Sequence, residues 1–457
     1  MRGRALWALG TAGLLGTAML AACGGSGGSS GSSNTLTVEY WTNNDIPGTN
    51  ATPKLIKAAA AELAKQHPGV KIVTDPITTD SESQYYAKLD LQESSSNTSP
   101  DVVLEDSFLI GADSSAGYIR ALPQLAKWSG WSAFAPAMQK IITYNGKIYG
   151  VMNGTDVQLL YYDANLFKKA GIPVPWQPHS LADIVAAAKK LKAADPGVIP
   201  AWIYTGLPLG EASSFRGFEV FLNGTGQQLY DPATGKWEVS GAGYTTTWNF
   251  LQAMRPYEEP ESDWSNPNGA STVNLTLMPA QKVGMVFDGM WVSENYVKGG
   301  PKPWPQFFST YQVAKLPTSA GQGSGYVDQS GGWAWSIPVR AHNPSLALDM
   351  IEDMSSAKNL AQYDALDGDI PPRDDVTSQP EWKQLTAQDP DMTLATGLLQ
   401  YTTFRPNLTD YTQISNEIAS LTGDVASGSM TAAAAEAAYQ AKVTSIVGPS
   451  KTQAGGS

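Results

Sequence analysis

The chain has 457 residues, and its 42 acidic side chains against 30 Lys and Arg give a formal net charge of −12 at pH 7. This length predicts two domains, and the acidic balance argues against nucleic acid or an anionic bilayer as the ligand. The single cysteine excludes an intramolecular disulfide and a thiolate metal cluster, and the three histidines are too scattered to favour a metal site. The 14 tryptophans and 19 tyrosines leave aromatic side chains available for a binding cleft.

The N-terminal residues have the features of a targeting segment. Arg2 and Arg4 precede a short apolar stretch, and residues 20–23 read Leu-Ala-Ala-Cys, which resembles the lipobox of bacterial lipoproteins. We therefore predict a signal peptide over residues 1–22 and lipid modification of Cys23. The alternative is a stray cysteine behind an ordinary signal peptide.

A Gly/Ser-rich segment, residues 23–34, separates the targeting segment from the rest of the chain. Such a composition predicts a flexible tether that holds a folded body away from the membrane surface. The body is expected over residues 35–447, where no hydrophobic stretch approaches the length of a membrane span. Residues 448–457 are expected to form a short tail.

The first third of the body alternates between strand and helix patterns. Strands are predicted near residues 36–40, 70–73 and 101–104, and helices over residues 53–66 and 83–93. Strand–helix units in series predict a parallel, doubly wound sheet.

The pattern changes near residue 145. Asn145 and Gly146 lie between two short apolar runs, which predicts a hairpin. A buried strand is expected over residues 157–162, followed by helices over residues 164–170 and 180–192, the second with Ser180 as its N-cap. Further along, residues 331–355 predict a strand and then a helix, and residues 412–446 are largely helical.

Several short motifs, spread over most of the body, resemble those of the family 1 extracellular solute-binding proteins, the carbohydrate receptors related to maltose-binding protein. Each motif is short, and the signal comes from their order behind a lipobox. They are Gly146 to Val151, Tyr161 to Asp163, Leu166 to Ile172, Gln281 to Met285, Phe287 to Trp291, Gly331 to Trp333, and Ile370 to Arg373.

The resemblance implies an α/β, two-lobed fold like that of periplasmic binding proteins, in which each lobe is a doubly wound sheet flanked by helices and a hinge joins the lobes. By that analogy, residues 35–144 and 311–357 form the first lobe, and residues 145–309 and 358–447 form the second. The hairpin that interrupts the strand–helix alternation supports the first crossing. The second crossing rests on the resemblance alone.

Two candidate ligand-binding residues come from the resemblance. In the family, a tryptophan at the position of Trp291 stacks on the sugar, and an acidic residue at the position of Asp156 faces the cleft. The alternatives are a core tryptophan and a turn aspartate. Asn153 and Asp288 are neighbouring candidates, and Asp288 could instead cap the following helix.

Other candidates follow from where ligands bind in open α/β sheets, at the carboxyl ends of strands. Trp41, Asn43 and Asn44 follow the first strand, and Asp106 follows the third. In addition, Gly332 would let backbone approach a ligand closely, beside Trp333, and Arg373 could bind sugar hydroxyls. Each of these residues could equally be an ordinary loop, bulge or core residue.

These features predict a lipid-anchored receptor on the extracellular face of a bacterial membrane, which captures a carbohydrate by closing its lobes. Its expected partners are the membrane permease subunits of an ABC importer, with an ATPase subunit behind them. A monomer with no cofactor and no bound metal is expected. The alternatives are a secreted glycoside hydrolase, which needs two carboxylates facing each other across a sugar, and a receptor for a solute that is not a sugar.

Overall fold

The computed structural model describes residues 34–43, 51–79 and 81–455. The predicted signal peptide, Cys23, most of the tether and Asn44 therefore lie outside the described residues. Asn43 ends the first strand, and only its backbone is described.

The first sheet has five strands in the order β2-β1-β3-β14-β6. Strand β1 (Thr35–Asn43) pairs in parallel with β2 (Lys71–Thr79) and with β3 (Val102–Asp106), which confirms the parallel start expected from the sequence. Strands β14 (Trp333–Ser336) and β6 (Gly150–Met152) are added to β3 in antiparallel pairs, so the sheet is mixed.

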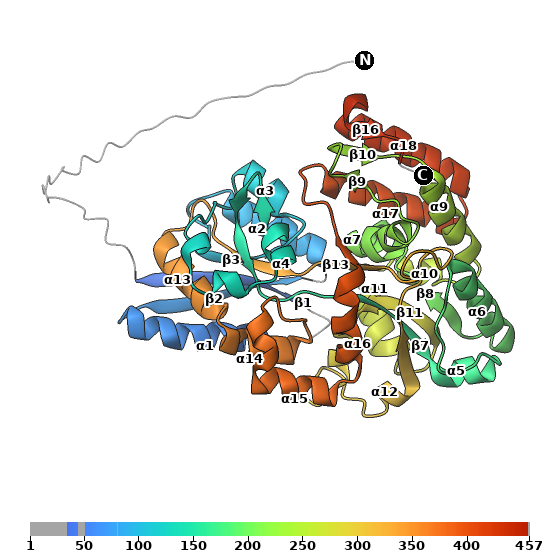
Figure 1. Cartoon of the computed structure of the whole chain (residues 1–457), viewed down its shortest axis with the longest axis horizontal. Helices are drawn as coiled ribbons and strands as arrows, with labels where there is room; N and C mark the ends of the chain where they lie inside the picture. Colours follow the sequence, from blue (N-terminus) through green and yellow to red (C-terminus); the bar gives the residue numbers. More distant parts are fainter. Residues whose placement is uncertain (1–33, 44–50, 80, 456–457) are drawn as a thin grey trace, which may run out of the picture. The chain divides into compact units, whose positions relative to one another are not determined.

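Alternation of side chains along β1 and β3 builds a core on each face of this sheet. On one face, Leu36, Val38 and Leu104 pack against helices α1 (Ala51–Gln66), α13 (Pro344–Met354) and α14 (Ala357–Asp367). On the other face lie α2 (Glu82–Glu93) and α3 (Ile110–Ala116). Figure 1 shows α1 and α14 below the strands and α2 and α3 above them.

The second sheet has four strands in the order β12-β7-β11-β8. Strand β11 (Val283–Gly289) runs antiparallel to β7 (Gln158–Asp163) and parallel to β8 (Ile199–Trp202), and β12 (Tyr311–Ala314) runs antiparallel to β7. All seven residues of β11 are buried. This is expected of a central strand covered on both faces.

Helices cover both faces of the second sheet. One face packs against helices that include α6 (Leu181–Ala194), α9 (Ala242–Met254), α17 (Tyr411–Ser427) and α18 (Ala432–Val447). The other face packs against α12 (Phe307–Thr310) and α16 (Asp391–Leu398).

Local sequence signals explain the predicted turn and caps. Strands β4 (Thr143–Tyr144) and β5 (Lys147–Ile148) form the expected hairpin, and both Asn145 and Gly146 have positive φ, as the tight hairpin turn requires. The Ser180 hydroxyl accepts a hydrogen bond from the backbone N–H of Asp183 at 3.3 Å and so caps α6.

The division of the chain between the two sheets differs from the ranges expected for the lobes. Strand β6 follows the hairpin but belongs to the first sheet, and β12 belongs to the second sheet. Helix α14, which was expected with the second lobe, packs with α1 against the first sheet. The chain therefore passes between the sheets after Met152, between Ala314 and Trp333, and again after α14.

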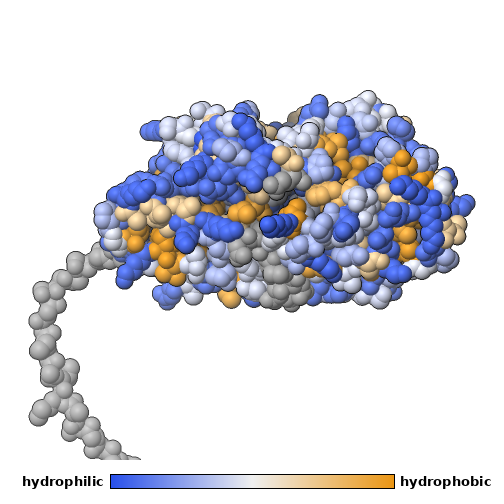
Figure 2. Space-filling model, turned by 90° about the horizontal axis from the view of Figure 1, so that it is seen from below, coloured by the Kyte–Doolittle hydropathy of each residue, from blue (hydrophilic) through white to orange (hydrophobic). Residues whose placement is uncertain are grey.

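In the part of the chain that the structure describes, no helix is both long and apolar enough to cross a bilayer. On the face drawn in Figure 2, hydrophilic side chains predominate and apolar side chains form separate patches. Small scattered apolar patches are normal on a folded protein.

Candidate binding cleft

A cavity of about 350 Å³ lies between residues of the first sheet and residues that surround the second sheet. Trp41 near the end of β1, Asp106 at the end of β3 and Trp333 at the start of β14 line it from the first side. Strand β14 is antiparallel to β3, and Trp333 pairs directly with Asp106. Trp41 and Asp106 thus lie together, as expected for the ends of parallel strands, and Trp333 lies beside them.

Two tryptophan rings form an aromatic wall on this side of the cavity. The ring centroids of Trp41 and Trp333 lie 5.8 Å apart with an angle of 26° between the planes. Tyr85 and Tyr86 pack against Trp333, with centroid distances of 6.0 and 6.1 Å. The Trp41 indole N–H donates to the Thr79 hydroxyl at 2.9 Å. The wall is therefore held in place from behind, while both tryptophans remain only partly buried.

Trp291 lies on the opposite wall, in the short helix η6 (Met290–Asn295). A Cβ on Gly289 would fall 2.1 Å from the Trp291 ring, so the ring lies directly against the glycine backbone. The Arg216 guanidinium carbon is 4.8 Å from the centroid of the Trp291 ring, within the range of a cation–π contact. Glycine and arginine together fix the orientation of this ring.

Asp288 lies behind this wall and does not line the cavity. Its side chain is fully buried, accepts hydrogen bonds from the Tyr204 hydroxyl and from the Asn274 amide at 3.1 Å, and pairs with Arg216 at 3.1 Å. The structure therefore places Asp288 as the support for two cavity residues, Arg216 and Asn274. It does not cap the next helix, because Gly289 occupies that position without a side-chain cap.

A second arginine connects the two sides of the cavity. Arg405 pairs with Asp106 at 2.9 Å and with Glu211 at 3.0 Å. Its guanidinium carbon is 4.6 Å from the centroid of the Phe108 ring and 4.7 Å from that of Phe215. Neither Arg405 nor Arg216 was predicted from the sequence, since the carboxylates that identify them lie far away along the chain.

Asp156 lines the cavity and is only 8 % exposed. It accepts hydrogen bonds from the Gln158 amide at 3.2 Å and from the Gly331 N–H at 3.3 Å. Burial raises the pKa of the Asp156 carboxyl to about 6, although the positive charge of Arg405 acts in the opposite direction. Burial likewise raises the pKa of Asp106 to about 6, and the positive charge of Arg405 again acts in the opposite direction.

Asn153 and Gly332 were also candidates. Gly332 lines the cavity with a φ of +123°, and a Cβ there would fall 2.4 Å from the Gly154 carbonyl oxygen, so only glycine fits. Asn153 is fully buried and does not line the cavity, and its side-chain amide makes no hydrogen bond with the described residues.

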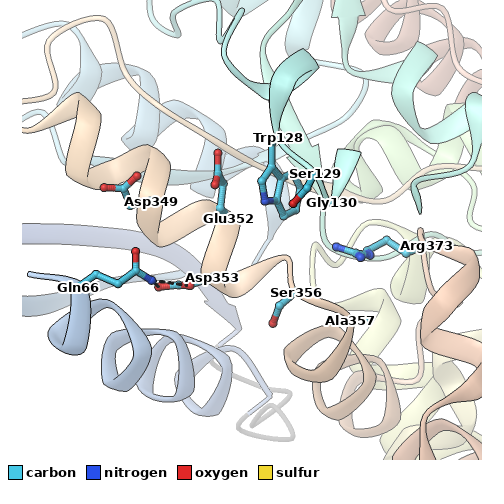
Figure 3. Close-up of a pocket in the computed structure, with 10 residues that line it drawn as sticks. All are labelled: Gln66, Trp128, Ser129, Gly130, Asp349, Glu352, Asp353, Ser356, Ala357 and Arg373. Atoms are coloured by element: carbon cyan, nitrogen blue, oxygen red, sulfur yellow. Dashed lines mark hydrogen bonds between the residues drawn. The ribbon is translucent and has the colours of Figure 1, made fainter. Parts of the chain in front are cut away.

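The structure places Arg373 away from this cavity. Its guanidinium pairs with Asp375 at 2.7 Å and donates to the Ser355 carbonyl oxygen at 2.8 Å. It lines a separate hollow of about 300 Å³ beside Trp128 and the acidic residues of α13, of which Glu352 is one (Figure 3). The expectation that Arg373 reaches a ligand in the cleft is therefore corrected.

The cavity also contains acidic residues that the sequence did not single out. They are Glu82, Glu211, Glu294, Asp367 and Asp369. Burial, and then the negative charge of Asp106, raise the pKa of Glu82 to about 7. Carboxylates are common loop residues, and nothing in their local sequence distinguishes these five.

Within the described ranges, no group of three His, Cys, Asp or Glu side chains has the arrangement of a metal site.

Comparison with known proteins identifies the family. Residues 58–393 match the family described as bacterial extracellular solute-binding protein. A maltooligosaccharide ABC transporter solute-binding lipoprotein of Streptococcus pneumoniae R6 is 24 % identical over 311 residues, which is 65 % of either chain. The maltodextrin-binding protein MdxE of Bacillus subtilis 168 is 21 % identical over 72 % of this chain and 73 % of its own length.

Solved structures share the fold. The maltose-bound MalE3 protein of T. maritima superposes with a TM-score of 0.74 at 18 % identity, covering 90 % of this chain and 100 % of its own. A solute-binding protein of Thermotoga lettingae bound to α-D-tagatose gives a TM-score of 0.73 at 21 % identity, covering 90 % and 99 %. The architecture is thus the two-lobed one of binding proteins, as expected, and the chain belongs to the family of bacterial extracellular solute-binding proteins.

Proposed function

We propose that the protein is a carbohydrate receptor that closes two lobes around a saccharide and delivers it to an ABC importer. The observation that carries this proposal is the cavity with tryptophan rings on both walls and carboxylates and arginines between them. Because the family consists of solute-binding proteins, we interpret these rings and charged groups as ligand contacts and not as the catalytic groups of a hydrolase.

The chemistry of the cavity suits a sugar. A pyranose has an apolar ring face, which the wall of Trp41 and Trp333 or the ring of Trp291 would cover. Its hydroxyl groups would be bound by side chains such as Asp156 and Asn274. A hydrogen bond to a charged partner contributes roughly 1.5–3 kcal/mol, so a few such bonds set specificity among sugars. Related proteins with names that specify maltooligosaccharides, maltodextrin and lactose support this class of ligand.

Lobe closure would assemble the site, because one wall of the cavity belongs to the lobe of the first sheet and the other wall to the lobe of the second sheet. The aromatic wall is attached to the first sheet, and Trp291, Arg216 and Asn274 are attached to elements around the second. The stretches that pass between the sheets would serve as the hinge, and closure would make the loaded state distinguishable to the permease subunits.

The lipobox-like residues Leu20 to Cys23 support a lipid anchor on the extracellular face of the membrane. Replacing Cys23 with Ser is expected to move the protein from the membrane fraction to the medium or to leave an unprocessed precursor. Lipid-labelled, detergent-requiring protein from the Cys23→Ser chain would contradict the anchor. We expect the receptor to act as a monomer.

A thermal-shift screen tests the proposed ligand class. The panel contains maltose, maltotriose, lactose, mannotriose and tagatose, with amino acids and short peptides as the controls of another class. A ligand at 100 times its dissociation constant stabilises the folded state by about 2.7 kcal/mol, which is readily seen. The bound saccharide must also return intact by mass spectrometry after a day with the protein. Shifts with peptides alone, or steady cleavage of the sugar, would contradict a sugar receptor.

A further inference from the structure

The charges along the wall of the cavity are unevenly distributed. Asp106 and Glu211, from the two sides of the cavity, are paired, because Arg405 binds both. Arg216 is engaged by Asp288 behind the wall. Both arginines that line the cavity therefore already have anionic partners, and among its described lining residues there is no lysine or histidine.

One end of the cavity is acidic. Glu294 extends from η6, and Asp367 and Asp369 flank the left-handed Gly368 that ends α14. A Cβ on Gly368 would fall 3.5 Å from the Glu294 carboxylate oxygen, so that carboxylate lies against the turn. The Tyr363 hydroxyl donates a hydrogen bond to Asp367. We call Glu294, Asp367 and Asp369 the acidic end.

The electrostatics of the acidic end favour an added positive charge. Burial, and then the negative charges of Asp367 and Asp369, raise the pKa of Glu294 well above its usual range. Burial, and then Asp367 and Asp156, do the same for Asp369. One buried Glu294 oxygen has no hydrogen-bond partner in the described structure. A cation placed here would relieve a repulsion that neutral hydroxyl groups would leave in place.

Two buried amides that line the same cavity also leave side-chain oxygens for a ligand that donates hydrogen bonds. Asn274 and Asn295 line the cavity and are each 2 % exposed. Their NH₂ groups are used, by Asp288 at 3.1 Å and by the Val292 carbonyl oxygen at 3.0 Å. The side-chain oxygen of each has no partner in the described residues. A buried acceptor without a donor is costly, so a ligand that donates hydrogen bonds would satisfy both.

From this arrangement, and on the basis of the proposed function, we infer that the saccharide carries a protonated amino group, which binds at the acidic end. An ammonium group has three donors and no acceptor, which matches carboxylate and amide oxygens. A metal ion fits less well, because no group of three possible ligands among the described residues has the required arrangement.

The test compares saccharides of the same length and linkage, one of each pair with amino groups in place of hydroxyl groups: three in the first pair and one in the second. The pairs are the β-1,4-linked glucosamine trimer with cellotriose, and 6-amino-6-deoxymaltotriose with maltotriose. Dissociation constants are measured by calorimetry on the intact chain at pH 6.5, in low and high salt. We expect the amino member of at least one pair to bind about tenfold or more tightly than its partner, with a preference that declines as salt rises.

Variants locate the effect. Asp369→Asn and Glu294→Gln should each remove most of the preference for the amine, because affinity for the amine should fall more than affinity for its neutral partner. Glu352→Gln, in the separate hollow of Figure 3, removes a carboxylate outside the cavity and should change neither affinity.

Neutral sugars that bind while neither amine binds more tightly would overturn this inference and leave the sugar receptor standing. An amine preference that survives in both Asp369→Asn and Glu294→Gln would also overturn it. If no saccharide of either kind binds, the proposed function itself fails.

Discussion

Two groups of buried carboxylates lie on different sides of the first sheet, and their surroundings differ. At the strand ends, Asp106 and Asp156 face the cavity and the positive charge of Arg405. On the face beneath α2 and α3, Glu39 and Glu105 are fully buried, and their carboxylate oxygens have no hydrogen-bond partner among the described residues apart from a contact between Glu105 and Asp113.

The consequence for charge is different in the two places. Burial raises the pKa of Glu39 to about 8, with a smaller contribution from Asp75, and burial with Asp113 raises the pKa of Glu93 to about 9. These carboxyls are neutral at pH 7 and belong to the core. Of the cavity carboxylates, Asp106 and Asp156, which lie near Arg405, have lower pKa values of about 6. Residue type alone therefore does not identify a binding carboxylate, whereas a nearby arginine and an open cavity do.

The largest effect is expected where the cavity charges are paired. Arg405→Met leaves Asp106 and Glu211 buried without their cation, and breaking a buried pair from one side costs about 3–5 kcal/mol. Urea unfolding should show the loss directly. As the matched control, Lys442→Met removes a half-exposed pair with Glu417 and should cost no more than about 1 kcal/mol. Equal losses of unfolding free energy in Arg405→Met and Lys442→Met would show that the buried pairs of Arg405 contribute no more to stability than a surface pair.

Trp291→Ala is expected to weaken saccharide binding roughly 10- to 100-fold, because it removes the aromatic face of one wall. The melting temperature should stay within a few degrees of wild type, since the ring is only partly buried. Trp128→Ala, a half-buried tryptophan in the hollow beside Arg373, is the control and should leave affinity unchanged. Calorimetry with the tightest-binding sugar of the panel measures the affinity of both variants. Equal affinities in Trp291→Ala and Trp128→Ala would contradict a role for Trp291 in binding.

Asp156→Asn keeps the shape of the side chain but removes the charge from its hydrogen bonds to a ligand. Affinity should fall by roughly one to two powers of ten, with the smaller value expected if the Gln158 amide adjusts. The same calorimetric titration measures it. Unchanged affinity in both Asp156→Asn and Trp291→Ala would mean that the ligand binds elsewhere.

The core carboxylates predict how stability depends on pH. The folded-state pKa values of Glu39, Glu93 and Asp113 are raised to about 8, 9 and 7, above their ordinary values near 4. A raised pKa means that the folded state holds its proton more tightly, so the contribution of these three groups to stability is fully present below about pH 4 and is lost as pH rises through about 7 to 9.

Glu39→Gln should reduce this loss and stabilise the protein by about 1–2 kcal/mol at pH 8.5 relative to wild type, with little change at pH 5. Asp156→Asn is the matched comparison from the cavity and should have its main effect on binding. Denaturant midpoints measured between pH 5 and 9 test both. A wild-type free energy of unfolding that rises between pH 5 and 9 would contradict the raised pKa values of Glu39, Glu93 and Asp113.

Local signals explain what the sequence could predict. The parallel strands β1, β2 and β3, the turn at Asn145 and Gly146, and the cap at Ser180 each depend on a few adjacent residues. Trp41 and Asp106 were candidates because strand ends meet at one edge of a sheet, and Trp333 was a candidate because two glycines precede it. Trp291 and Asp156 came from the family resemblance.

Contacts between distant parts of the chain explain what was missed. Arg405 becomes a site residue only through Asp106, which is 299 positions away. Arg373 was a candidate because it follows two prolines in a family motif, but its partner, Asp375, is local and keeps it outside the cavity. The hairpin at residues 143–148 was taken as the first crossing because it breaks the pattern, yet the chain adds β6 to the first sheet before it leaves.

The most direct test of the central claim is small-angle X-ray scattering with and without a saturating saccharide, chosen as the tightest binder of the thermal-shift panel. Closure of the two lobes around the ligand should lower the radius of gyration of the wild-type protein. Trp291→Ala at the same sugar concentration should show a smaller change, which recovers when more sugar is added. Tight binding confirmed by calorimetry with an unchanged radius of gyration would contradict capture by closure.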